Sequence, residues 1–137
     1  CTVKCPSSQF GKMDGFVCTD CADGCATCYD AGINSCYSCK ANTTGVAHFL
    51  IYGTDTCDPS CPDGQYQNST AFQCLLCSSV CKTCETNSTN CLSCGMSPFG
   101  YPVFLNGSRC LATCPSGKWA NATTFQCDAC EVGCTAC

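Results

Sequence analysis

Aromatic residues recur along this chain at two fixed places after each Cys-Pro pair. They stand five and eleven residues after the cysteine, as Phe10 and Phe16, Tyr66 and Phe72, and Trp119 and Phe125. The residues between the two aromatics are polar and turn-forming, for example Gln-Asn-Ser-Thr-Ala in the second case. This pattern predicts three short β-hairpins, each with its two aromatics packed on a disulfide on one face and a polar tip in solvent.

Two longer apolar runs stand between these hairpins. The first contains Phe49, Leu50, Ile51 and Tyr52 within Val46–Tyr52, and the second is Phe99–Leu105. Each run has the length of a strand, and no run approaches the 18 or more apolar residues that cross a bilayer. Two interpretations stay open: each run packs as a strand on the next hairpin, or it forms a surface for lateral contact between molecules.

Cysteine spacing turns these local patterns into a repeat. Cys5, Cys61 and Cys114 each begin a Cys-Pro pair that is followed by C-x2-C-x3-C-x2-C, and these starts lie 56 and 53 residues apart. Repetition at this period predicts tandem units stacked into an elongated rod of short β-hairpins and loops with little helix. The predicted divisions are 1–4, the end of a preceding repeat; 5–60, repeat 1; 61–113, repeat 2; and 114–137, the first half of repeat 3.

The composition favours a small disulfide-rich fold. Cysteine supplies 22 of the 137 residues, whereas Leu, Ile, Val and Phe together supply 21, too few for an ordinary core. Bridges that close loops of about 7–18 residues each remove roughly 2–3 kcal/mol of unfolded-state entropy. Disulfides at this density need an oxidising compartment, so the chain is expected to be secreted or to lie at the cell surface.

Sequons and charge refine this expectation. Five N-x-[ST] sequons predict N-linked glycans at Asn42, Asn68, Asn87, Asn106 and Asn121. The formal net charge is −4, and the six Lys and Arg residues are scattered, so no basic stripe exists for nucleic acid or anionic lipid. No membrane span is expected in this window, which opens and closes inside a repeat and is interpreted as part of a longer protein.

The cysteine pattern resembles the furin-like cysteine-rich repeats of growth-factor receptors and proprotein convertases, and equally the repeat arrays of protist surface proteins. The resemblance covers the whole chain and rests on the Cys-Pro start, the aromatics, the C-x2-C-x3-C core and the closing C-x3-C. It implies single bridged loops that alternate with a crossed pair. The implied bridges are Cys5–Cys18, Cys21–Cys28, Cys25–Cys36, Cys39–Cys57, Cys61–Cys74, Cys77–Cys84, Cys81–Cys91, Cys94–Cys110, Cys114–Cys127 and Cys130–Cys137. Cys1 and Cys134 are left to pair with neighbouring segments.

Other chemistry is disfavoured by the residues. Paired C-x2-C motifs are typical of zinc sites in cytosolic proteins, but here they lie in a dense field of cysteines beside a single His, His48. No isolated C-x-x-C motif stands in a βαβ setting, as a thioredoxin-like role would need. His48 lies in an apolar run, which favours packing, and Trp119 is interpreted as a packing residue rather than a carbohydrate platform. The sequence therefore predicts no enzyme, no metal and no cofactor.

The preferred function is that of an extracellular structural glycoprotein, a disulfide-stapled rod in a surface coat or fibre. Its expected partners are neighbouring repeats of the same protein, with lateral self-association as a further expectation. Two alternatives stay open: a ligand-binding or adhesion receptor ectodomain, with contact residues in the two apolar runs, and the cysteine-rich regulatory tail of a secreted protease.

Overall fold

The structure is a computed structural model, and it describes residues 4–12, 17–134 and 137. The described residues form short strands and no helix. The fold is therefore a small disulfide-rich β fold, as the sequence predicts. Among the described residues, no helix has the length and apolar character that crossing a bilayer requires.

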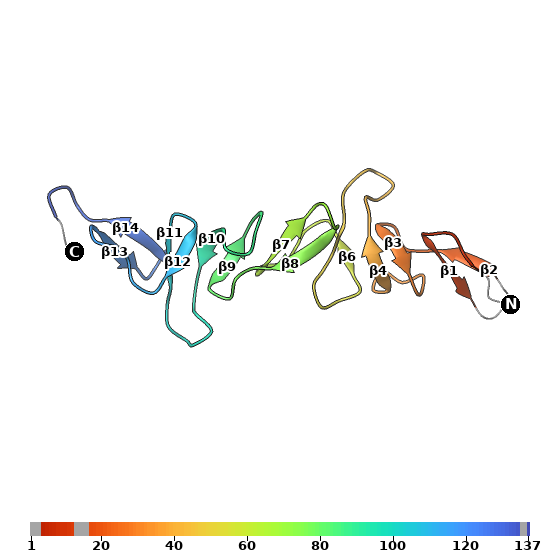
Figure 1. Cartoon of the computed structure of the whole chain (residues 1–137), viewed down its shortest axis with the longest axis horizontal. Coiled ribbons are helices and arrows are strands. Elements are labelled where there is room, and N and C mark those ends of the chain that lie inside the picture. The colour runs from red at the N-terminus through yellow and green to blue at the C-terminus, as the bar shows by residue number, and fades with distance from the viewer. Residues whose placement is uncertain (1–3, 13–16, 135–136) are drawn as a thin grey trace. The chain divides into compact units, whose positions relative to one another are not determined.

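The strands come as hairpins in chain order (Figure 1). Their bounds are β1 Gln9–Lys12, β2 Val17–Asp20, β3 Cys25–Cys28, β4 Cys36–Cys39, β5 Phe49–Leu50, β6 Cys57–Asp58, β7 Gln65–Asn68, β8 Gln73–Leu76, β9 Cys81–Cys84, β10 Cys91–Cys94, β11 Phe104–Asn106, β12 Arg109–Leu111, β13 Lys118–Asn121 and β14 Gln126–Ala129. Each strand is two to four residues long, so no strand buries enough side chains to form a core by itself.

The strands form two kinds of sheet. The pairs β1–β2, β3–β4 and β9–β10 are two-stranded sheets, whereas β6-β5-β8-β7 and β12-β11-β14-β13 are four-stranded. In each four-stranded sheet a strand of the preceding repeat lies parallel to the second strand of the next hairpin, at Leu50↔Gln73 and at Leu105↔Gln126. The predicted hairpins in repeats 2 and 3 are thus completed by residues from the repeat before them.

The chain divides into two compact units whose limits differ from the predicted repeat boundaries. One unit contains Cys1–Pro62 and Gln67–Leu75, and the other contains Asp63–Tyr66 and Leu76–Cys137. The division therefore runs through the β7–β8 hairpin of repeat 2. Each unit contains one of the two parallel strand pairings across a repeat boundary.

Cysteines make up most of the buried interior. Of the fourteen buried apolar residues in the described part of the chain, ten are cysteines, and the other four are Phe10, Phe49, Val103 and Phe104. Cys25 and Cys36 are almost fully buried, with exposed fractions of 1% and 0%. A disulfide-bonded sulfur is apolar and carries no charge, so bridges replace the aliphatic side chains that fill the core of an ordinary domain.

Candidate functional site

Ten disulfides hold the described cysteines together. The pairs are the same ten that the resemblance implies: Cys5–Cys18, Cys21–Cys28, Cys25–Cys36, Cys39–Cys57, Cys61–Cys74, Cys77–Cys84, Cys81–Cys91, Cys94–Cys110, Cys114–Cys127 and Cys130–Cys137. Their Cα–Cα distances run from 5.2 to 5.9 Å, within the range that a disulfide spans without backbone movement. Cys134 is free and exposed, and Cys1 lies outside the described residues.

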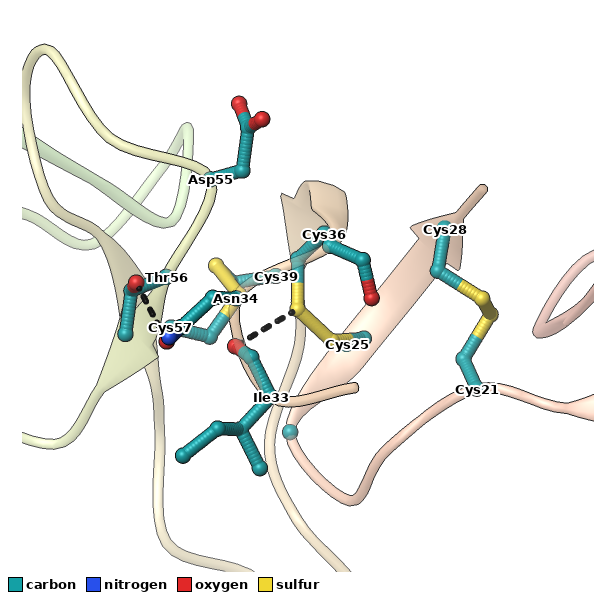
Figure 2. Close-up of a disulfide and its surroundings, with 12 residues drawn as sticks. Cys21, Cys25, Cys28, Ile33, Asn34, Cys36, Cys39, Asp55, Thr56 and Cys57 are labelled. Carbon is teal, nitrogen blue, oxygen red and sulfur yellow. Dashed lines mark hydrogen bonds between the residues drawn. A yellow bond between two sulfur atoms is a disulfide. The ribbon is translucent and has the colours of Figure 1, made fainter. Parts of the chain in front are cut away.

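The crossed pair of bridges surrounds the β3–β4 hairpin. A disulfide joins Cys25 of β3 to Cys36 of β4, although the strand register pairs Cys25 with Cys39 and Cys36 with Cys28. Cys28 ties the end of β3 back to Cys21 (Figure 2). Cys57 reaches this block from the loop that returns to the hairpin, and its sulfur lies within 4.8 Å of the sulfurs of Cys25 and Cys36. Three chain segments therefore meet around one group of sulfur atoms.

The same block contains a hydrogen-bonded pair of hydroxyls that the sequence analysis missed. The Oγ1 of Thr27 lies 2.6 Å from the Oγ of Ser38 across the β3–β4 hairpin, and Thr83 and Ser93 make the same contact at 2.5 Å in repeat 2. Both pairs lie at a register shift between the two strands. The signal was present in the sequence, because each block reads C-x-T-C and then C-x-S-C.

The joint between successive repeats is built in the same way twice. Phe49 of β5 stacks on Phe72 of the next hairpin, with ring centroids 6.3 Å apart and planes 27° apart. Phe104 of β11 stacks on Phe125, also at 6.3 Å, with planes 21° apart. Phe49 and Phe104 are buried, at 4% and 6% exposed. Of the two open interpretations of the apolar runs, the structure therefore shows the strand that packs on the next hairpin.

Backbone geometry at the joint repeats as closely as the rings do. The backbone N–H of Leu50 donates to the carbonyl oxygen of Phe72 at 2.9 Å, and the N–H of Leu105 donates to the carbonyl oxygen of Phe125 at 2.8 Å. Phe72 and Phe125 both have positive φ angles, 52° and 55°. A bulky residue rarely adopts this left-handed conformation because its Cβ crowds the backbone. The same costly conformation at both joints indicates that it serves the junction.

In the hairpin of repeat 2 the two aromatics have different neighbours, which corrects for this hairpin the expectation that both cap one disulfide. Tyr66 packs against the buried group of Cys81, Cys84 and Cys91, whereas Phe72 and Phe125 stack on the preceding repeat. The other predicted packing aromatics are Phe10, which is buried, and Trp119, which keeps 43% of its surface exposed. Phe16 lies outside the described residues. Sequence spacing showed that the aromatics recur but not which neighbour each one meets.

The five sequon asparagines lie in turns or at strand ends. In four of them, Asn42, Asn68, Asn87 and Asn121, the side-chain oxygen accepts hydrogen bonds from the backbone N–H groups of the turn that follows. In Asn106 the side-chain oxygen accepts from the Nζ of Lys118 at 2.6 Å. These asparagines are exposed or half-buried, so the turns hold each side chain at the surface.

The turn at Asn42 also binds a carboxylate from outside the turn, that of Asp23. Asp23 accepts hydrogen bonds from the Oγ1 of Thr43 at 2.9 Å and from its backbone N–H at 3.1 Å. The side-chain hydrogen bond from Thr43 is the main reason why the pKa of Asp23 lies below its usual value of 3.8. The carboxylate thus links the start of β3 to the loop that leaves β4.

The sulfur groups do not offer thiolates to a metal. Within the described ranges, two groups have metal-like spacing: Cys25, Cys36 and Cys57, and Cys81, Cys91 and Cys110. Every one of these sulfurs is in a disulfide, whereas a zinc ligand must be a free thiolate. The Nδ1 of His48 lies 3.0 Å from the carbonyl oxygen of Val46 in its own loop, and the Cδ2 position of the ring lies close to Gly24.

The tip of each long loop is a five-residue turn with the same hydrogen bonds. The turn at Asn42–Val46 and the turn at Ser97–Tyr101 each close with an N–H···O bond of 2.8 Å between their ends, and each has a glycine with φ of +83° at the fourth place. The first tip is polar and includes a sequon. The second presents Phe99, which is 84% exposed and stacks on Tyr101 with ring planes 10° apart.

Comparisons with known proteins relate the whole chain to cysteine-rich regions of larger proteins. The chain is 28% identical over 137 residues to Furin-like protease 2 of Drosophila melanogaster, which covers 100% of the chain and 7% of that protein. It is 28% identical over 158 aligned positions to Cysteine repeat modular protein 2 of Tetrahymena thermophila, and this match covers 100% of the chain and 8% of that protein. It is 30% identical over 137 residues to the human Extracellular matrix organizing protein FRAS1, and this match covers 100% of the chain and 3% of that protein.

These relatives are much longer than the chain, and they bear on its location. No protein-family model matches the chain. The chain spans less than a tenth of the length of each of these three relatives. The dense disulfides, together with relatives that include a protease and a matrix-organising protein, indicate a secreted or extracellular location.

Proposed function

The chain is a tandem array of furin-like cysteine-rich repeats, and we propose that it serves as a non-catalytic structural segment of an extracellular glycoprotein. In this proposal the segment is an elongated, disulfide-stapled rod at the cell surface, in a coat or a fibre. The observation that carries the proposal is the joint between repeats. The same buried ring, parallel strand pairing and backbone hydrogen bond occur at Phe49 and at Phe104.

A joint of this kind lets repeats be added without a new core. Each repeat supplies a buried phenylalanine at its end and a hairpin edge at its start, so every added repeat buries its predecessor's aromatic ring. The bridges within a repeat keep its shape without a long hydrophobic interior. N-linked glycans on the five sequon asparagines, Asn42, Asn68, Asn87, Asn106 and Asn121, would shield the sides of the array. They would be the only non-protein groups, with no metal or cofactor.

Small-angle X-ray scattering of the secreted, deglycosylated chain tests the rod. A compact domain of this length has a radius of gyration of about 14 Å. A rod gives a clearly larger radius and a pair-distance distribution with a long tail, whereas a value near 14 Å would contradict it. Electron microscopy of the native source then tests the coat or fibre, because a structural segment should appear in extended arrays. Neighbouring repeats are the proposed partners, and sedimentation velocity tests lateral self-association.

The exposed tip of repeat 2 favours a second candidate, a ligand-binding or adhesion segment. Phe99 is 84% exposed on a turn held by hydrogen bonds, and exposed aromatics on rigid turns are typical of binding surfaces. Binding of the labelled, secreted chain to cells and matrix would then be lost in Phe99→Ser. Unchanged binding in Phe99→Ser would contradict the binding candidate and would not affect the structural proposal. The relationship to Furin-like protease 2 also keeps a regulatory tail of a protease as a candidate.

A further inference from the structure

Two tyrosines lie against each other on the outside of repeat 1. The ring centroids of Tyr29 and Tyr37 are 5.2 Å apart and the ring planes are 52° apart. Both side chains are open to solvent, at 46% and 63% exposed. The contact is fixed by the β3–β4 hairpin. Tyr29 directly follows Cys28 and Tyr37 directly follows Cys36, and these two cysteines lie opposite each other in the strand register.

This pair is not part of the repeat framework. The corresponding positions in repeat 2, directly after Cys84 and Cys91, hold Glu85 and Leu92. The β9–β10 hairpin nevertheless has the same register as β3–β4. The framework therefore forms without the tyrosines, and packing of the repeat does not explain why two phenols lie together here.

A carboxylate is in place to take a proton from one of the phenols. The hydroxyl of Tyr29 donates to the Oδ2 of Asp55 at 3.0 Å and also lies 3.1 Å from the carbonyl oxygen of Asn34. This hydrogen bond is the main cause of a raised pKa for Tyr29, because it stabilises the protonated phenol next to a negative charge. One-electron oxidation removes both an electron and this proton, and the carboxylate is a ready acceptor for the proton.

We propose that Tyr29 and Tyr37 are a site of oxidative cross-linking, at which a haem peroxidase and hydrogen peroxide join the two rings by a carbon–carbon bond. Each phenol loses one electron and one proton, and the two radicals couple at ring carbons next to the hydroxyl-bearing carbons. The hydrogens on those two carbons then shift to the phenol oxygens. One hydrogen peroxide takes up the two hydrogens lost and becomes two waters. The product is a covalent link between the end of β3 and the start of β4 that no thiol can reduce.

Mass mapping of the secreted, disulfide-intact chain tests the proposal directly. The chain is treated with a peroxidase and limiting hydrogen peroxide at low protein concentration, then reduced, alkylated and digested with trypsin. Residues 13–40 form one tryptic peptide, which contains Tyr29 and Tyr37 and none of the five sequons. The expected product is this peptide with two hydrogens fewer, dityrosine fluorescence, and no fragmentation between the two tyrosines.

Matched variants separate the site from general tyrosine oxidation. Tyr37→Phe should abolish the linked peptide, and Asp55→Asn should slow its formation. Tyr101→Phe, which alters an exposed tyrosine stacked on a phenylalanine, should leave the linked peptide unchanged. Equal loss of two hydrogens from peptide 41–82, which contains Tyr52 and Tyr66, or tyrosine-linked dimers without an internal link in peptide 13–40, would overturn the proposal. Cross-linking of these two tyrosines in a reduced and alkylated chain as readily as in the folded chain would also overturn it.

Discussion

The joint in repeat 2 makes a quantitative prediction about Phe104. In Phe104→Ala the chain loses a ring that is only 6% exposed and stacks on Phe125. Removing a buried phenylalanine costs about 3–5 kcal/mol of unfolding free energy. Phe125 is itself half-buried, so the thin core can relax into the space, and we expect the low end of this range, about 3 kcal/mol.

The fluorescence of Trp119 reports the loss of unfolding free energy in the sheet that contains Phe104. It is the only tryptophan of the chain, and it lies in β13, in the same four-stranded sheet as Phe104 in β11. Urea unfolding of the disulfide-intact chain, followed by Trp119 fluorescence, should show a midpoint lowered by about 3 M, for a slope of about 1 kcal/mol per M. The amide of Leu105, which donates across the joint, should lose its protection from hydrogen exchange in the same variant.

The matched control is Phe99→Ala, which removes the same side chain from the same loop at a position that is 84% exposed. Its unfolding free energy should stay within about 0.5 kcal/mol of the parent. Equal effects of Phe99→Ala and Phe104→Ala would refute the reasoning. Such a result would mean that the bridges alone determine stability and that the buried ring at the joint contributes nothing.

Three further predictions follow from the geometry of repeat 1. In Gly24→Ala the new Cβ would lie 2.8 Å from a histidine ring at a φ of +89°, so thermal unfolding should show a loss of about 2 kcal/mol; an unchanged midpoint would contradict this. Replacing Cys39 and Cys57 by serine opens a loop of 18 residues and should cost about 3 kcal/mol in urea unfolding, so a loss below about 1 kcal/mol would argue against the loop model. The hydrogen bond from Thr43 lowers the pKa of Asp23 below 3.8, so the contact between Asp23 and Thr43 should persist at pH 3.8. It should be lost only as the pH falls through the lowered pKa of the folded chain. An NMR titration of Asp23 with a midpoint at or above 3.8 would contradict this prediction.

Much of the local structure could be predicted because cysteine spacing and turn residues act over short distances. The hairpin at β13–β14, for example, follows from two aromatics around a polar turn, and the Cys114–Cys127 disulfide ties β14 to the segment before β13. The disulfide pairs came from the resemblance to a known repeat and not from spacing, because eight cysteines allow 105 pairings. The Thr27–Ser38 contact could have been found from C-x-T-C and C-x-S-C, whose strand register places the two hydroxyls together.

The sequence by itself determined the repeat, its period and the oxidising chemistry on which the fold depends, because these are properties of residue type and spacing. Only the tertiary structure decided that Phe72 stacks on Phe49 of the preceding repeat rather than on a bridge of its own hairpin. It also decided that the compact units divide inside a hairpin rather than at a Cys-Pro start. The reason is physical: a residue's neighbours across a joint depend on a left-handed turn at Phe72 and a parallel strand pairing, which no local pattern in the chain specifies.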